Sequence, residues 1–285
     1  MSSSERDWMS PEFDRSQKER PKLPWTITKC LIVLNVAIFV LGMLWTQPLQ
    51  SNSGLPYGGN VSVPFLYGFY SEFTCWHLGE YWRLVTYQFL HANLGHLAFN
   101  MVALYFFGGL VEKIMGEKRY ILFYLICGIS GALFSTLLGS LGLYDGGPAM
   151  DGYRLVPMVG ASGSIYGILV AGAFIFPKIK VQLLFPPVTL TMRTLAWALV
   201  GLSVVIIGFD LRNAGGEAGH MGGMIMGLLL IMIPYFRGKG ARKIMISTQE
   251  EIDRILDKIH VEGQDSLTEN EREFIERIAR ESRGR

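Results

Sequence analysis

The sequence predicts an all-α polytopic membrane protein, with a bundle of six transmembrane helices followed by a small helical cytoplasmic tail. Half of the 285 residues are hydrophobic and only 18% are charged. The charged residues gather in a few short segments, and long apolar runs lie between them. This alternation is typical of a chain that crosses a bilayer several times.

Each expected helix is an apolar run that polar, glycine or proline residues bound on both sides. The six runs cover about residues 27–45, 94–111, 120–141, 162–176, 192–209 and 217–236. The fourth run is short, so it need not cross the whole bilayer. A short charged loop, residues 112–119, is expected between the second and third helices.

Residues 47–90 are too polar, and too often interrupted by glycine and proline, to cross a bilayer. They carry many aromatic side chains, which favour the membrane interface. We expect an interfacial loop that packs on the bundle, with a gating role as the alternative.

The chain divides into three predicted parts. Residues 1–24 form a polar arm that we expect to be disordered, residues 25–237 form the six-helix domain, and residues 238–285 form the helical tail. Within the tail, Thr268 and Glu271 have the spacing of a capping box, which marks a helix start. No residue of the tail has a context that indicates catalysis.

The distribution of lysine and arginine predicts the orientation in the cell (inner) membrane. Six crossings place both termini on one side, and the basic residues concentrate in the terminal segments and in the loops on that same side. The positive-inside rule therefore makes both termini cytoplasmic. Ser162 and His220 then lie near the extracytoplasmic ends of their helices, at similar depth.

Ser162 is the first candidate for chemistry, because polar residues within membrane helices are functional candidates by default. It lies where a polar loop gives way to an apolar helix, and Gly160 and Gly163 leave its hydroxyl unshielded. The free N–H groups of a helix start could bind an oxyanion. A serine alone in such a segment is usually a packing residue.

His220 begins a pattern of small residues in which Gly223 and Gly227 form a groove beside its face. Another helix can approach such a groove closely. The small residues expected to face it are Gly163 and Gly167, which follow Ser162 on the fourth helix. Close approach would bring the imidazole within hydrogen-bond reach of the hydroxyl, which makes a serine nucleophilic.

No aspartate or glutamate is suitably placed in the sequence to orient His220. Asp145 and Asp151 lie in the loop before Ser162, and Asp210 lies in the loop before His220. Tyr166 could instead stack on the imidazole and hold it. The sequence therefore predicts a catalytic dyad rather than a triad.

His96 and Asn100 are four residues apart, so they share one face of the second helix. Two neutral donors beside a nucleophile suit an oxyanion hole, and the alternative is a hydrogen-bonded pair between helices. A zinc site built from His91, His96 and His220 is disfavoured by the ligand spacing, and no His-Glu-x-x-His motif is present.

Four separated motifs together resemble the rhomboid family of intramembrane serine proteases. They are Trp82-Arg83, His96-Leu97-Ala98-Phe99-Asn100, Gly160-Ala161-Ser162-Gly163 with Tyr166, and His220-Met221-Gly222-Gly223-Met224-Ile225-Met226-Gly227. The resemblance covers about residues 24–236. It implies a six-helix bundle whose site opens to the extracytoplasmic side, with the fifth helix and loop 210–216 as substrate gate and cap.

The resemblance also implies the roles of the site residues. Ser162 would be the nucleophile and His220 the general base. His96 and Asn100, with the backbone N–H of Ser162, would form the oxyanion hole, and Tyr166 would support His220.

The predicted function is hydrolysis of transmembrane segments of other membrane proteins, single-pass proteins among them, within the lipid bilayer. No metal, organic cofactor or nucleic acid is expected, and the oligomeric state is left open. A non-catalytic protein that only recognises transmembrane helices is one alternative, and a transporter is another. The serine and histidine argue against the first, and the lack of paired discontinuous helices argues against the second.

Overall fold

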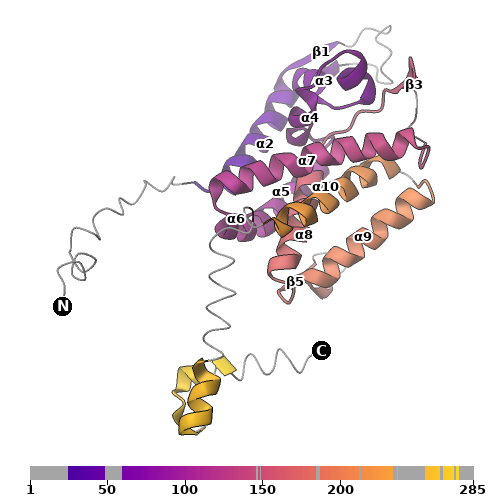
Figure 1. The fold of residues 1–285 in the computed structure, drawn as a ribbon. Helices are drawn as coiled ribbons and strands as arrows, with labels where there is room; N and C mark the ends of the chain where they lie inside the picture. Colours follow the sequence, from indigo (N-terminus) through magenta and orange to yellow (C-terminus); the bar gives the residue numbers. More distant parts are fainter. Residues whose placement is uncertain are drawn as a thin grey trace, which may run out of the picture.

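The computed structural model describes residues 25–48, 60–145, 147, 149–183, 187–211, 213–233, 236, 254–263, 266–272 and 274–275. The long helical segments within these ranges match the six apolar runs of the sequence (Figure 1). They are α2 (Ile27–Leu44), α5 (Leu94–Ala103) with its continuations η5 (Leu104–Gly108) and α6 (Gly109–Met115), α7 (Glu117–Ser140), α8 (Ser162–Ile175), α9 (Met192–Gly208) and α10 (Ala214–Met232).

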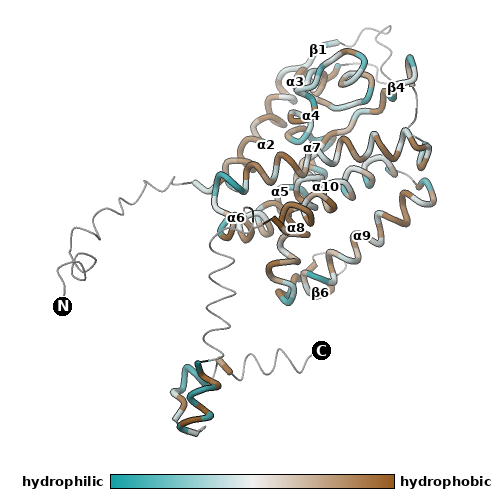
Figure 2. The backbone as a smooth tube through the Cα atoms, viewed as in Figure 1, coloured by the Kyte–Doolittle hydropathy of each residue, from teal (hydrophilic) through white to brown (hydrophobic). Residues whose placement is uncertain are grey.

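Three of these helical segments are long and apolar enough to cross a membrane: Ile27–Leu44, Leu94–Met115 and Glu117–Ser140. The helices α8 and α9 are apolar but shorter. Brown, hydrophobic residues dominate the helices of the bundle, whereas teal residues gather at turns and in the tail (Figure 2). The chain is an integral membrane protein of helical type, and six complete crossings stay a prediction.

The helix α10 holds the bundle together, because it packs against α7, α8 and α9. It lies between α7 and α9 in Figure 1. Glycines allow the close packing: a Cβ atom on Gly222 would lie 2.7 Å from the carbonyl oxygen of Ser130 in α7. The main apolar core includes Tyr120, Phe123 and Tyr124 of α7 together with residues of α8 and α10, such as Ile168 and Ile231.

The predicted loop at residues 112–119 is wrong, because these residues are helical apart from Gly116. Gly116 adopts a left-handed backbone (φ +79°) that ends α6 and lets α7 begin at once. The carboxylate of Glu112 accepts hydrogen bonds from Ile27 N (2.7 Å), Thr28 N (2.9 Å) and Thr28 Oγ1 (2.6 Å). A helix start favours negative charge, so Glu112 caps α2 from a neighbouring helix.

The described residues between α2 and α5, called the first loop below, fold into short strands and helices. Strands β1 (Thr46–Pro48) and β2 (Asn60–Ser62) pair antiparallel. The short helices α3 (Val63–Gly68), η3 (Phe73–His77), α4 (Arg83–Thr86) and η4 (Tyr87–Phe89) follow. In Figure 1, α3 and α4 lie near the upper end of α2 and above α7.

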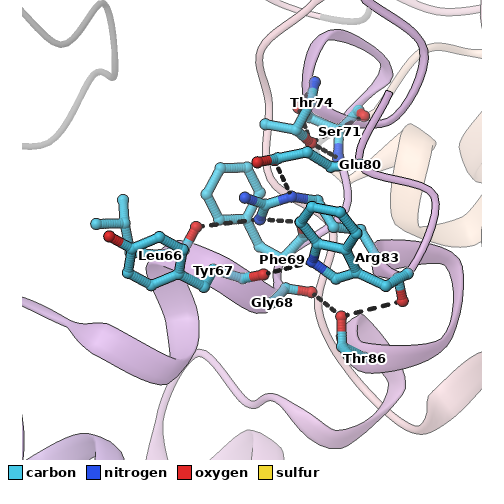
Figure 3. A network of polar contacts seen from close by, with 10 residues as sticks. Leu66, Tyr67, Gly68, Phe69, Ser71, Thr74, Glu80, Arg83 and Thr86 are labelled. Atoms are coloured by element: carbon cyan, nitrogen blue, oxygen red, sulfur yellow. Dashed lines mark hydrogen bonds and ion pairs between the residues drawn. The ribbon is translucent and has the colours of Figure 1, made fainter. Parts of the chain in front are cut away.

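Arg83 organises this first loop from within (Figure 3). Its side chain is only 4% exposed and pairs with Glu80 at 2.6 Å. Its Nη1 atom donates to the carbonyl oxygens of Leu66 (3.0 Å) and Phe69 (2.8 Å). One buried guanidinium thus satisfies two backbone carbonyls at the C-terminal end of α3.

Two further hairpins connect the helices. Strands β3 (Ala149–Met150) and β4 (Tyr153–Arg154) lie between α7 and α8. Strands β5 (Lys180–Gln182) and β6 (Thr189–Thr191) lie between α8 and α9.

The tail contains the predicted capping box. The carboxylate of Glu271 accepts from Thr268 N at 2.9 Å, and the hydroxyl of Thr268 accepts from Glu271 N at 3.3 Å. Arg254 (2.7 Å) and Lys258 (3.0 Å), in the helix at residues 254–262, pair with the same carboxylate. The expected disordered arm at 1–24 lies outside the described residues, as do parts of the predicted tail.

Candidate active site

Ser162 is the first residue of α8, as the sequence predicted. The chain reaches it through Gly160, whose left-handed backbone (φ +130°) suits glycine. The N–H of Gly160 donates to the carbonyl oxygen of Tyr87 at 3.0 Å, so the first loop fixes this approach. A Cβ atom at Gly160 would lie 2.8 Å from His96 Nε2, hence only glycine leaves room for both side chains.

The predicted glycine contact brings α10 against α8. A Cβ atom on Gly227 would lie 2.6 Å from Gly167 Cα, and one on Gly223 would lie 2.7 Å from the carbonyl carbon of Gly163. At this separation His220 Nε2 lies 2.8 Å from Ser162 Oγ, which is a hydrogen bond. The two stretches, 58 residues apart in sequence, therefore meet.

Tyr166 lies one turn after Ser162 and stacks on the imidazole of His220. The ring centroids are 4.2 Å apart and the ring planes differ by 9°. The stack limits tilting of the imidazole ring, because a tilted ring would collide with the ring of Tyr166. This is the contact that the sequence predicted for Tyr166.

Glu217 is a neighbour of His220 that the sequence analysis missed. Its Oε2 atom lies 3.2 Å from His220 Nδ1, and the two side chains are 12% and 16% exposed. The sequence analysis began the last helix at Glu217, whereas α10 begins at Ala214 and places Glu217 in its first turn. The i, i+3 spacing on one helix was the available signal.

His96 and Asn100 both lie in α5, one turn apart. His96 lines the same cavity as Ser162 and His220. The Nδ2 atom of Asn100 is buried and has no hydrogen-bond partner among the described residues. His91 packs edge-on against His96, with ring centroids 5.1 Å apart. Burial lowers the pKa of His91 to about 4, so this imidazole is neutral at physiological pH.

A cavity of about 800 Å³ opens beside the Ser162–His220 pair. Its wall also includes Arg154, Met158 and Gly160. Arg154 forms an ion pair with Glu72 at 3.2 Å. A cavity of this size has room for water and for an extended stretch of polypeptide.

Two of the loop aspartates, Asp145 and Asp210, line the same cavity. The carboxylate of Asp210 accepts from Asp145 N at 3.0 and 3.1 Å, and Asp151 lies 3.7 Å from His77. Among the residues that the structure describes, no group of three histidine, cysteine, aspartate or glutamate side chains could hold a metal ion.

The apolar bundle and the Ser162–His220 contact define a class of protein: an integral membrane protein of helical type in which a serine hydroxyl is hydrogen-bonded to a histidine. Comparison with known families makes this specific. A family model described as the rhomboid domain matches residues 78–236, more than half of the chain. The chain therefore belongs to the rhomboid family of intramembrane proteases, as its four motifs predicted.

Individual relatives agree with this assignment. The chain is 30% identical to rhomboid protease GluP of Bacillus subtilis over 204 residues. The aligned region covers 71% of this chain and 33% of the relative. It is 27% identical to rhomboid protease AarA of Providencia stuartii over 218 residues. This second aligned region covers 73% of this chain and 74% of the relative. The chain thus spans about a third of the length of the first relative and about three quarters of the second.

The tail has a separate match. Residues 245–281 fit a family of unknown function (DUF6576), so this part of the chain is similar to a recurring sequence family of its own.

Proposed function

We propose that this protein is an intramembrane serine endopeptidase that cleaves transmembrane segments of other membrane proteins with a Ser162–His220 dyad. The observation that carries the proposal is the 2.8 Å contact between His220 Nε2 and Ser162 Oγ, within an apolar bundle and beside a cavity. Such a contact converts a weakly nucleophilic hydroxyl into an activated one.

The mechanism follows from these two side chains. Ser162 Oγ attacks the scissile carbonyl carbon while its proton passes to His220 Nε2. The C–N bond then breaks, and the imidazolium protonates the leaving amine. Water attacks the acyl-enzyme in the same way, with His220 again as base, and restores Ser162. No metal or organic cofactor takes part.

The oxyanion of the tetrahedral intermediate needs donors. His96 and Asn100, together with the backbone N–H of Ser162, are the proposed donors. The unpartnered Nδ2 atom of Asn100 supports this role, since a buried donor without an acceptor is otherwise unfavourable. Tyr166 would hold the imidazole through its stack.

We place the protein in the cell (inner) membrane with six crossings, both termini in the cytoplasm and the site open to the extracytoplasmic side. The charge distribution of the loops supports this orientation. Water would enter through the cavity, and the substrate helix must unwind locally, because an intact helix keeps its carbonyls in hydrogen bonds. We propose no particular substrate.

The experiment uses the purified full-length chain in detergent with a tagged single-pass membrane protein as substrate. Cleavage is compared between wild type, Ser162→Ala and His220→Ala, and labelling of Ser162 by a fluorophosphonate is followed in parallel. We expect cleavage and labelling to be lost in Ser162→Ala and to fall at least about a thousandfold in His220→Ala.

Ser164→Ala is the matched control. Ser164 lies on the same helix, is fully buried and donates a hydrogen bond to Gln88 at 3.0 Å. The control should keep cleavage in the range of the wild type. Cleavage that persists in Ser162→Ala would overturn the proposal. A pure substrate-binding protein or a transporter would give no Ser162-dependent cleavage at all.

A further inference from the structure

We propose that Glu217 is a positioning residue for the general base: its carboxylate accepts the Nδ1 hydrogen of His220, and Ser203 of α9 holds that carboxylate in place. This inference rests on the proposed function, because it requires His220 to act as the base for Ser162. It adds an acidic partner to the dyad that the sequence predicts.

The tautomer of His220 makes an acceptor necessary. Nε2 must be unprotonated to take the proton of Ser162, so the neutral ring carries its hydrogen on Nδ1. Nδ1 is buried and forms no hydrogen bond of good geometry with any residue that the structure describes. The carboxylate oxygen of Glu217 at 3.2 Å provides an acceptor within reach.

The location of Glu217 suits this role. It lies three positions before His220 on α10, so the two side chains share a helix face. Both are largely shielded from solvent, which strengthens the attraction between them. Catalytic hydrogen bonds are often poorly aligned in a free enzyme and tighten when substrate binds. When His220 takes the serine proton it becomes cationic, and the adjacent carboxylate stabilises that state.

Ser203 fixes the glutamate side chain. Its hydroxyl donates to the same Oε2 atom at 2.7 Å, and Ser203 is completely buried in α9. A glutamate has several freely rotating torsions, so a second hydrogen bond lowers the entropy lost when it holds His220. The hydrogen bond also makes the position of Glu217 depend on α9, the helix at the edge of the bundle (Figure 1).

A purely structural role is the alternative. An acidic side chain in the first turn of a helix is favourable by itself. A hydrogen bond to Ser203 would then only join α9 to α10. The two roles differ in what they change: positioning alters the reactivity of each folded site, whereas a structural tie alters how many sites are folded.

The test measures the rate constant and the final amplitude of Ser162 labelling by a fluorophosphonate, together with kcat, KM and Tm, on the full-length chain in detergent. Glu217→Gln keeps the size and one acceptor oxygen but removes the charge, and Glu217→Ala removes both. We expect the labelling rate constant to fall about tenfold in Glu217→Gln and about a hundredfold in Glu217→Ala. The drop should appear in kcat, with KM and the labelling amplitude close to wild type.

Two control variants separate the roles. Glu112→Gln removes another buried carboxylate, whose hydrogen bonds go to the start of α2, and should lower Tm but leave the labelling rate constant unchanged. Ser203→Ala removes the tie to α9 but leaves the carboxylate beside His220, so it should slow labelling only about two- to threefold.

The outcomes are distinct. A Glu217→Gln variant with lower Tm and amplitude but a wild-type rate constant would overturn the positioning role. Equal rate losses in Ser203→Ala and Glu217→Gln would also overturn it, because the helix tie would then be the cause. Cleavage that survives Ser162→Ala would instead defeat the proposed function itself, whatever Glu217 does.

Discussion

Replacing Gly223 by alanine should separate the two halves of the site. The added methyl group would lie 2.7 Å from the carbonyl carbon of Gly163, and ordinary contact begins near 3.4 Å. The helices α8 and α10 would have to move apart by about 1 Å, since the obstacle is backbone and cannot rotate away. The Nε2–Oγ distance, 2.8 Å in the wild type, would then lie beyond a good hydrogen bond.

A displacement of about 1 Å at reacting groups can lower the rate about a hundredfold. We therefore expect Gly223→Ala to slow fluorophosphonate labelling of Ser162 by roughly that factor, and to lower the free energy of unfolding by about 1–3 kcal/mol through overpacking. Labelling kinetics and thermal unfolding in the same detergent measure the two effects separately.

Two other glycines provide the controls. A Cβ atom on Gly201 in α9 would meet nothing within 4 Å, so Gly201→Ala should keep the wild-type labelling rate and add up to about 1 kcal/mol of stability. Gly222 faces α7, where a Cβ atom would lie 2.5 Å from Phe134 Cβ, so Gly222→Ala tests crowding on another side of the same helix. A wild-type labelling rate in Gly223→Ala would refute the reasoning.

Three further predictions follow from single side chains. Asn100→Ala should lower kcat by about 10²–10³ if its amide stabilises the oxyanion; a loss of thermal stability with unchanged kcat would instead indicate a helix–helix hydrogen bond. Glu112→Gln should lower the free energy of unfolding by about 1–3 kcal/mol, because a buried charged acceptor at the start of α2 is lost, and thermal unfolding should detect this. In the tail, hydrogen bonding from Thr268 lowers the pKa of Glu271 from 4.5 to about 2. The contribution of this carboxylate to tail stability should therefore be complete above about pH 5 and be lost as the pH falls toward 2. Circular dichroism of a peptide covering residues 245–285 should follow this loss, and Glu271→Gln should remove it.

The sequence by itself determined the helices and the site residues Ser162, His220, His96 and Asn100, because these depend on local patterns. Apolar runs form helices in a membrane whatever their neighbours are, since the bilayer offers no other partner to the backbone. The glycines around Ser162 and His220 predicted the close contact because glycine alone permits it, and His96 with Asn100 followed from helical spacing.

Only the tertiary structure decided the surroundings of these residues. The Glu112 carboxylate caps α2 through a hydrogen bond from Thr28 N, a residue 84 positions earlier in the sequence. Arg83 similarly depends on carbonyl groups that the folded first loop presents to it.

Glu217 shows the difference most clearly. Its spacing to His220 was visible in the sequence, but its orientation depends on where α10 begins and on Ser203 in the neighbouring helix. Local patterns fix which residues share a helix face. The partners that a polar side chain finds across the bundle are fixed only when the helices pack, because that packing sets the phase and depth of each helix.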